Sequence, residues 1–438
     1  MSIELITLLM VGSIAVLLIM GLPLAFVTGF VALSFAVGNF GLNGIFLIES
    51  RIVTLVREFV LVAVPMFILM ASVLERSGVA RDLYRAMHIW SGGLRGGLAI
   101  QTMVVAVLMA AMTGIIGGEI ILLGLVALPE MLRRNYDKGL AIGTICAGGS
   151  LGTMIPPSIV LIIYGLTANV DIGRLFLATV FPGLLLASIY IAYIVIRCQR
   201  DHTLGPLAPL AERNLPRAEK LHLLRGLVLP LGVAAGVLGS IYMGIASVSE
   251  AAGMGAVGAI ASAAVRRELS WTMLRGALFQ TMNTCGMLLW ITFGATALIG
   301  VYNLLGGDTF IKGLITGLPL PPLGIIVVMM AVLMVLGLFM DWIGICLLTM
   351  PIFVPVVIAL GYSPIWFGIL FCMNMQISYL TPPFGPAAFY LKGVAPEGIN
   401  LSDIYRALWP FIGLQAIGLA IVLFFPEVAL WLPEVLRK

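Results

Sequence analysis

The chain has 438 residues, of which 61% are hydrophobic and only 10% are charged, whereas soluble domains carry about 25% charged residues. A chain this apolar could not cover its surface with polar groups in water. We therefore predict an all-α, multi-pass membrane protein whose solvent is the lipid bilayer. The net charge of +4 lies in loops, which argues against nucleic acid, and the five cysteines and three histidines lack the spacing of a disulfide framework or a transition-metal site.

Long apolar segments follow one another along the chain. We expect helices near 3–20, 23–41, 55–74, 97–131, 139–165, 174–197, 226–243, 250–265, 276–303, 322–360, 366–393 and 408–434. The first segment has no basic start and no small-residue cleavage site, so it is interpreted as a span rather than a signal peptide.

Two of these segments are too long for one crossing of about 20 residues. Segment 97–131 is interrupted by MTGIIGGE at 112–119, and segment 322–360 by FMDW at 339–342. Irregular backbone at membrane depth is tolerated only where protein or a watery cavity surrounds it. We therefore predict two re-entrant hairpins whose tips stop inside the bilayer, with a single long kinked helix as the alternative in each case.

Two other segments contain a proline pair, Pro156-Pro157 and Pro382-Pro383. Proline removes a backbone donor and clashes with the preceding turn, so we expect both helices to be broken there. The freed carbonyls suit a dehydrated sodium ion, and the half-helix N-termini favour a carboxylate. The alternative is that the prolines only kink packed helices.

Loop charges orient the chain across the membrane. The basic loops share one side, predicted to be the cytoplasm: 76–95, 133–138, 197–225 and 266–275. The charge-poor loops share the other side: 166–173, 244–249, 303–322 and 360–365. The exceptions, which fall outside, are Arg51, Arg57, Arg437 and Lys438.

The two halves of the sequence resemble each other. Glu119 lies ten residues before Pro129 and Asp341 lies ten before Pro351, and a Pro-Pro pair follows in both halves. The first broken helix is expected to run outward and the second inward. This predicts an inverted repeat, a construction common in secondary transporters.

The repeat divides the chain. The first half is 1–200, with its first helices in 1–90, a hairpin and a broken helix in 97–165, and a connecting helix at 174–197. A cytoplasmic linker is expected at 201–225. The second half is 226–438, with helices in 226–303, a hairpin and a broken helix in 322–393, and a last helix at 408–434.

Polar side chains at the tips and breaks are the candidate ligands. Hydroxyl oxygens come from Ser150, Thr153, Ser378 and Thr381. Acids inside a membrane are costly and usually functional. Glu119 and Asp341 therefore either line a cation site or hold a hairpin tip by accepting backbone N–H bonds, and proton coupling through them stays open. Asn374 and Gln376 are either ligands or helix–helix contacts.

At these motifs the chain resembles the large membrane subunit of TRAP transporters, the tripartite ATP-independent periplasmic carriers. The resemblance covers nearly the whole chain, and it rests on a combination of motifs: ALPEMLRRNYDKGLAIGTICAGGSLGTMIPPSIVLIIYG (127–165), SVSEAAGMGAVGA (247–259), GLFMDWIGICLLTMPIFVPVVIALG (337–361) and LTPPFGPAAFYLKG (380–393).

The resemblance implies an elevator-type fold of the ion-transporter superfamily in the bacterial inner membrane. In such proteins a scaffold, here helices 1–90 and 226–303, stays fixed while the hairpins and broken helices move. Sodium drives uptake of an organic acid with a carboxylate. A periplasmic substrate-binding protein delivers the acid, and a separate small membrane subunit of about four spans supports the scaffold.

The resemblance also implies sodium and substrate sites formed by each tip and its broken helix. In the first half the matching residues are Thr113, Gly114, Gly117, Glu119, Gly148, Gly149, Ser150, Thr153 and Pro156. In the second half they are Asp341, Asn374, Gln376, Ser378, Thr381 and Pro382.

The first tip departs from the Ser/Ala/Thr-rich pattern of the family, because Ile115 and Ile116 stand between glycines. This favours a partly apolar or monocarboxylic substrate. Three alternatives remain: a binding-protein-independent carrier of dicarboxylates or similar anions, a channel, and an intramembrane enzyme. The enzyme is disfavoured because no Ser/Lys, paired Asp or His/Glu constellation stands out.

Overall fold

The computed structural model describes residues 2–79, 82–83, 94–114, 117–207 and 217–436, with the backbone alone for 217–227. The first half contains α1 (Ile3–Ile19), α2 (Leu24–Phe40), α3 (Asn43–Val56), η1 (Phe59–Val62), α4 (Ala63–Arg76), α6 (Gly97–Thr113), α7 (Gly118–Arg133), α8 (Lys138–Ser150), η2 (Leu151–Thr153), α9 (Ile159–Ala168) and α10 (Ile172–Arg200). The second contains α12 (Arg217–Tyr242), α13 (Val248–Val265), α14 (Trp271–Leu304), α15 (Gly307–Thr316), α16 (Pro322–Gly337), α17 (Trp342–Ala359), α18 (Pro364–Leu380), α19 (Pro386–Lys392), α20 (Leu401–Phe424) and α21 (Glu427–Val435).

The described regions are helical, as expected. Six helices in them are long and apolar enough to cross a membrane, and several shorter apolar helices accompany them. Exposed large apolar side chains are spread along these helices, for example Leu8, Phe26 and Trp290. Lipid is a suitable solvent for such a surface.

Both overlong segments are interrupted where the sequence predicts. In the first, α6 ends at Thr113 and α7 begins at Gly118; in the second, α16 ends at Gly337 and α17 begins at Trp342, after the N-cap Asp341. In each case the two helices pack against each other. A continuous kinked helix is therefore wrong for both segments. Whether the tips stop inside the bilayer stays a prediction.

Several helix boundaries differ from expectation. Helix α3 occupies residues between the predicted spans 23–41 and 55–74, and α15 lies in the predicted loop 303–322. Both helices carry charged residues among apolar ones, so neither is typical of a membrane span. Helix α12 begins at Arg217, within the expected linker 201–225. The last segment divides into α20 and α21 at Pro426, which caps α21.

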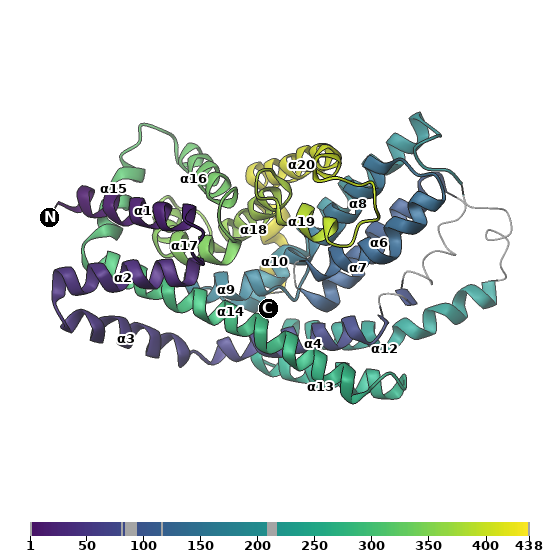
Figure 1. Ribbon diagram of the computed structural model, residues 1–438, viewed down its shortest axis with the longest axis horizontal. Helices are drawn as coiled ribbons and strands as arrows, with labels where there is room; N and C mark the ends of the chain where they lie inside the picture. The colour runs from purple at the N-terminus through teal and green to yellow at the C-terminus, as the bar shows by residue number, and fades with distance from the viewer. Residues whose placement is uncertain (1, 80–81, 84–93, 115–116, 208–216, 437–438) are drawn as a thin grey trace.

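The helices pack in two groups that touch along a seam. In one group α14 contacts α2, α3 and α4, and α13 contacts α4 and α12. In the other, α8 contacts α6, α7 and α20, while α18 contacts α16 and α20. The seam includes contacts of α17 with α14 and of α4 with α6. Figure 1 shows α1–α3 and α15 toward one end of the long axis and α6, α8 and α12 toward the other.

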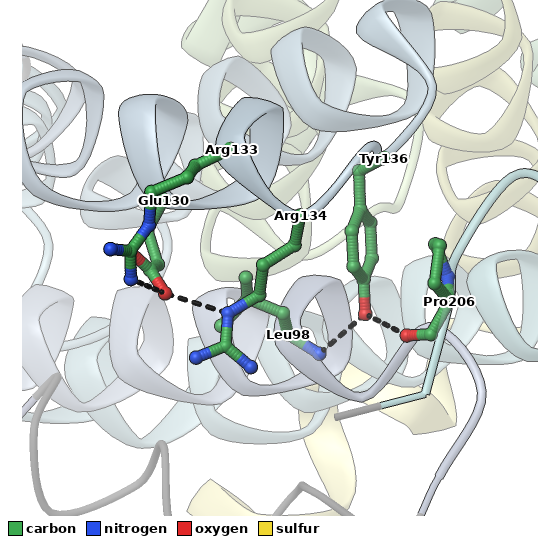
Figure 2. A network of polar contacts seen from close by, with 6 residues as sticks. All are labelled: Leu98, Glu130, Arg133, Arg134, Tyr136 and Pro206. Atoms are coloured by element: carbon green, nitrogen blue, oxygen red, sulfur yellow. Dashed lines mark hydrogen bonds and ion pairs between the residues drawn. The ribbon is translucent and has the colours of Figure 1, made fainter. Parts of the chain in front are cut away.

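The segment that follows α10 is fixed to the base of the first hairpin. Gly96 N–H donates to the Gly205 carbonyl at 3.0 Å, and Asp137 N–H donates to the Leu204 carbonyl at 3.0 Å. Figure 2 shows the Tyr136 hydroxyl between the start of α6 and this segment, accepting from Leu98 N–H at 3.1 Å and donating to the Pro206 carbonyl at 3.3 Å. Residues 201–207 therefore belong to the packed body.

The same end of the hairpin carries a surface ion-pair cluster. Glu130 contacts Arg133 at 2.8 Å and Arg134 at 2.6 Å, as Figure 2 shows. These i,i+3 and i,i+4 pairs close the last turn of α7 and contribute only a few tenths of a kcal/mol each. Both arginines lie at the C-terminal end of α7, where the helix dipole stabilises positive charge.

Candidate functional site

The first predicted break lies between α8 and α9. Helix α8 ends at Ser150, one 3₁₀ turn follows, and helical structure resumes only at Ile159. The peptide bond Pro156-Pro157 is cis. The carbonyls left without helical partners find side-chain donors: Ser158 Oγ donates to the Thr153 carbonyl at 2.7 Å, and Gln376 Nε2 donates to the Ser150 carbonyl at 2.9 Å. The backbone is thus opened, and side chains satisfy these two carbonyls.

The second predicted break lies between α18 and α19. Helix α18 ends at Leu380 and α19 begins at Pro386, with a cis bond between Pro382 and Pro383. The Thr381 hydroxyl donates to the Ile377 carbonyl at 2.6 Å, and the Tyr405 hydroxyl donates to the Pro383 carbonyl at 3.0 Å. Both proline pairs therefore interrupt their helices, and the interpretation that they only kink them is wrong.

One side chain joins the two breaks. Gln376 of α18 donates through Nε2 to the Thr153 hydroxyl at 2.7 Å and to the Ser150 carbonyl. Gln415 of α20 adds a bond from Nε2 to Ser150 Oγ at 3.2 Å. Gln376 is fully buried, and its Oε1 has no hydrogen-bond partner among the described residues. A buried acceptor without a partner is costly, so this oxygen is available to a ligand.

A small pocket of about 20 Å³ opens at this junction. A space of 10–15 Å³ holds one water molecule, so the pocket suits one water or one small ion. Its lining comes from both halves: Ser150, Thr153, Gly337, Met340, Asp341, Trp342, Met375, Gln376, Ser378, Tyr379 and Pro386. Five of the predicted site residues meet here: Ser150, Thr153, Asp341, Gln376 and Ser378.

Asp341 has the tip-holding role that the sequence offered as one of two. It is the N-cap of α17, and its Oδ2 accepts from Ile343 N–H at 3.2 Å. A capping carboxylate satisfies one donor of the new helix and complements its dipole. Because Asp341 also lines the small pocket, its charge lies near any cation held there.

The first tip forms a second polar cluster. Glu119 is 1% exposed, its Oε1 accepts the Thr113 hydroxyl, and its Oε2 has no partner among the described residues. The tip lies against the first break, since a Cβ on Gly114 would come within 1.9 Å of the Pro157 carbonyl oxygen. Gly114 also has a φ of +59°, which favours glycine. Ile115 and Ile116 lie outside the described residues.

The remaining predicted residues have packing roles around these clusters. Gly148 and Gly149 let α8 approach the hairpin: a Cβ on the first would meet Ala106, and one on the second would meet Ile120 at 2.3 Å. Gly117 lies against the Tyr390 ring. The Asn374 amide donates to the Met330 carbonyl of α16 at 2.7 Å. Outside the small pocket lie Thr113, Gly114, Gly117, Glu119, Gly148, Gly149, Pro156, Asn374, Thr381 and Pro382.

Sequence reasoning missed three polar residues at the site. Gln415 is 1% exposed and holds Ser150, and the buried Tyr379 hydroxyl has no partner among the described residues. Glu75 of α4 faces the first tip, because a Cβ on Gly118 would lie 3.0 Å from its Oε1. Gln415 could have been found as an amide inside an apolar span. Glu75 could not, because the neighbouring Arg76 makes it look like part of a helix end.

Two solved structures share this architecture. The Alcanivorax borkumensis YdaH transporter matches 88% of this chain and 88% of its own at a TM-score of 0.62. The Neisseria gonorrhoeae structure of MtrF, which is described as illuminating a class of antimetabolite efflux pumps, matches 88% and 85% at a TM-score of 0.62. Sequence identity is 15% to each, so the likeness concerns the fold. The fold and its long apolar helices define a polytopic, helical membrane protein.

Residues 11–428 match the family described as "Tripartite ATP-independent periplasmic transporter, DctM component", and the chain belongs to this family. The C4-dicarboxylate TRAP transporter large permease of Pseudomonas aeruginosa is 32% identical over 86% of this chain and 87% of its own, and that of Vibrio cholerae is 28% identical over 100% and 98%. The ectoine/5-hydroxyectoine large permease of Ruegeria pomeroyi is 30% identical over 86% and 87%. The resemblance drawn from the motifs is confirmed, and the chain is a transporter permease rather than an enzyme.

Proposed function

We propose that this permease takes up a small organic acid with a carboxylate, driven by sodium and supplied by a periplasmic binding protein, in the bacterial inner membrane. The observation that carries the proposal is the small pocket where both broken helices meet the second tip. Relatives are named for C4-dicarboxylates and for ectoine, which agrees with a small organic substrate. The partners are the binding protein and a small membrane subunit of about four spans.

The pocket suits sodium by size and by ligand type. Its volume of about 20 Å³ excludes an organic acid and admits a single dehydrated ion. Its lining offers oxygens of three kinds: the unpartnered Gln376 amide oxygen, the hydroxyls of Thr153 and Ser378, and the Asp341 carboxylate. Hard cations prefer such oxygens, and one carboxylate suits one positive charge.

The same junction favours an anion nearby. Helix α9 begins at the first break and α17 at the second tip, and at such N-termini backbone N–H groups and the helix dipole attract a carboxylate. Transporters with broken helices place their substrate and ions at such half-helix ends. A cation in the small pocket would add to this attraction, which is a physical basis for coupling the two.

Two observations support an elevator movement. The helices fall into two packing groups, and a large cavity of about 1340 Å³ lies between members of them, bordered by α3, α4, α13 and α14 on one side and by α9 and α17 on the other. Open space along this seam leaves room for one group to slide past the other. We propose that the group containing α6–α10 and α16–α21 moves and that the other is the scaffold.

Uptake into proteoliposomes tests the proposed function. The permease is reconstituted with its small subunit, and binding protein loaded with candidate carboxylates is added with and without an inward sodium gradient. We expect uptake only when both gradient and binding protein are present. Sodium-driven uptake without the binding protein would instead support the independent carrier, and gradient-independent flux of the acid would support a channel.

A matched pair of variants then locates the ion. Thr153→Val and Thr381→Val each remove one hydroxyl at a break, but only Thr153 lines the small pocket. We expect Thr153→Val to raise the half-saturating sodium concentration about tenfold, or about 1.4 kcal/mol, and Thr381→Val to leave it unchanged. The reverse result would place the ion at the second break. No change in either variant would contradict the small pocket as the sodium site.

A further inference from the structure

A second polar pocket lies away from the breaks, between α8, α10 and α20. Its volume is about 330 Å³, and its lining includes five charged residues: Asp137, Lys138, Arg197, Asp403 and Arg406. Helix α8 packs against both α10 and α20 around it. None of these five residues belongs to the candidate sodium and substrate site.

The two acids of this pocket each accept a backbone hydrogen bond at the start of their own helix. Asp137 caps α8, with its Oδ1 accepting from Leu140 N–H at 2.8 Å. Asp403 completes a capping box at the start of α20, with its Oδ2 accepting from Asn400 N–H at 3.1 Å. Neither makes an ion pair among the described residues. Their negative charge therefore lies at helix N-termini, and neither forms an ion pair with the basic residues of the lining.

None of the three basic side chains makes an ion pair among the described residues. Arg197 lies over the Tyr193 ring at 5.7 Å and donates to its hydroxyl at 3.3 Å. Lys138 and Arg406 have no hydrogen-bond or ion-pair partner in the described part of the chain. Lys138 moreover stands at the first position of α8, where the helix dipole disfavours a positive charge. Such an arrangement is stabilised when an anion sits between the three.

The rest of the pocket lining is largely apolar. It is formed by Leu140 and Ile142 of α8, Tyr193 of α10, and Pro410 and Phe411 of α20. The Tyr193 and Phe411 rings meet edge to face at 5.3 Å. A pocket lined by both basic and apolar side chains matches a molecule with an anionic head and a hydrocarbon tail, and it disfavours inorganic phosphate, which would leave the apolar part of the lining without a partner.

We propose that this pocket binds an anionic phospholipid of the cytoplasmic leaflet, such as phosphatidylglycerol. Its phosphodiester would lie between Lys138, Arg197 and Arg406, and one acyl chain would follow Phe411 and Tyr193. Lys138 and Arg197 lie in the ranges 133–138 and 197–225 that the charge pattern assigns to the cytoplasm, where anionic lipids attract basic groups, and Arg406 of α20 lines the same pocket. Guanidinium groups are well suited to phosphate oxygens.

Lipid titration followed by native mass spectrometry tests the proposal. The full-length permease in detergent is titrated with phosphatidylglycerol or with zwitterionic phosphatidylethanolamine, at constant ionic strength. We expect at least one phosphatidylglycerol to bind about tenfold more tightly than phosphatidylethanolamine. The double variant Lys138→Gln/Arg406→Gln should lose this preference, whereas Arg275→Gln, a basic residue outside the pocket, should keep it.

Three results would overturn the proposal: equal affinity for the two lipids, unchanged phosphatidylglycerol binding in the double variant, or displacement of the lipid by inorganic phosphate but not by an equal ionic strength of chloride. The last would mean that the pocket takes a free anion. Because the double variant could fold poorly, Arg406→Lys and Arg406→Gln are compared as well. The first keeps the charge and should retain binding, and the second should weaken it.

Discussion

At the candidate site, a single amide joins residues that are far apart in the sequence. Gln376 donates through Nε2 to the Ser150 carbonyl and the Thr153 hydroxyl of the first half, and it lines the small pocket with an Oε1 that has no partner among the described residues. The sequence offered Gln376 as either a ligand or a helix contact. The helix contact is present through the Nε2 hydrogen bonds, and the Oε1 atom, which takes no part in them, is the atom suited to an ion. The two interpretations are therefore compatible.

Close backbone approach at Gly149 gives a residue-scale prediction. A Cβ there would lie 2.3 Å from Ile120 Cγ1 and 3.1 Å from Ile120 N, so Gly149→Ala must push the first hairpin away from α8. Overpacking of this kind costs about 1–3 kcal/mol. We expect a lower melting temperature in detergent and weaker uptake.

Gly413→Ala is the control for this prediction, because Gly413 is also helical and nothing lies within 4 Å of its added Cβ. It should be neutral or slightly stabilising, since alanine favours helix by about 1 kcal/mol over glycine. Equal melting temperatures for the two variants would mean that hairpin and broken helix are not held by this contact.

Among the elements, the breaks and tips were predictable and the amphipathic helices were not. Pro156-Pro157, Pro382-Pro383 and Asp341 mark interruptions because proline and buried acids act locally on backbone hydrogen bonding. Helices α3 and α15 were not predicted, because their charged residues exclude them from a search for apolar spans. The meeting of Ser150, Thr153 and Gln376 depends on packing between halves, which no local pattern contains.

The segment 201–207 gives an element-scale prediction through Tyr136. Its buried hydroxyl joins the start of α6 to Pro206, so Tyr136→Phe should lose about 1 kcal/mol of stability. Burial raises the pKa of Tyr136 from 10.0 to about 12. Because the folded-state pKa is the higher one, the contribution is complete below about pH 10 and is lost as the pH rises through about 12.

Melting temperatures of wild type and Tyr136→Phe should therefore differ at pH 7–9 and converge toward pH 12. Tyr242→Phe is the control, since the Tyr242 hydroxyl is buried without a partner among the described residues. Its removal should not lower stability. A Tyr136→Phe protein as stable as wild type at pH 8 would mean that residues 201–207 are held by the backbone bonds alone.

At the scale of the whole molecule, the two packing groups predict that a cross-link between them stops transport. Glu75 of α4 lies beside Gly118 of the first tip, across the seam between the groups. In the double variant Glu75→Cys/Gly118→Cys, a short bifunctional maleimide should join the groups and abolish uptake, while each single variant treated in the same way keeps its activity. Four native cysteines are buried, and the half-buried Cys285 is replaced by serine beforehand. Full cross-linking with undiminished uptake would contradict the elevator proposal.

The anchoring of residues 201–207 also limits how far the two groups can separate. Leu207 ends a segment fixed to the base of the first hairpin, and Arg217 begins α12, which packs with α13 in the other group. Only nine residues lie between them, so this tether reaches about 35 Å at full extension. The length of this linker therefore sets an upper bound on the distance that one group can move relative to the other. This limit does not depend on anything at the ion or substrate site.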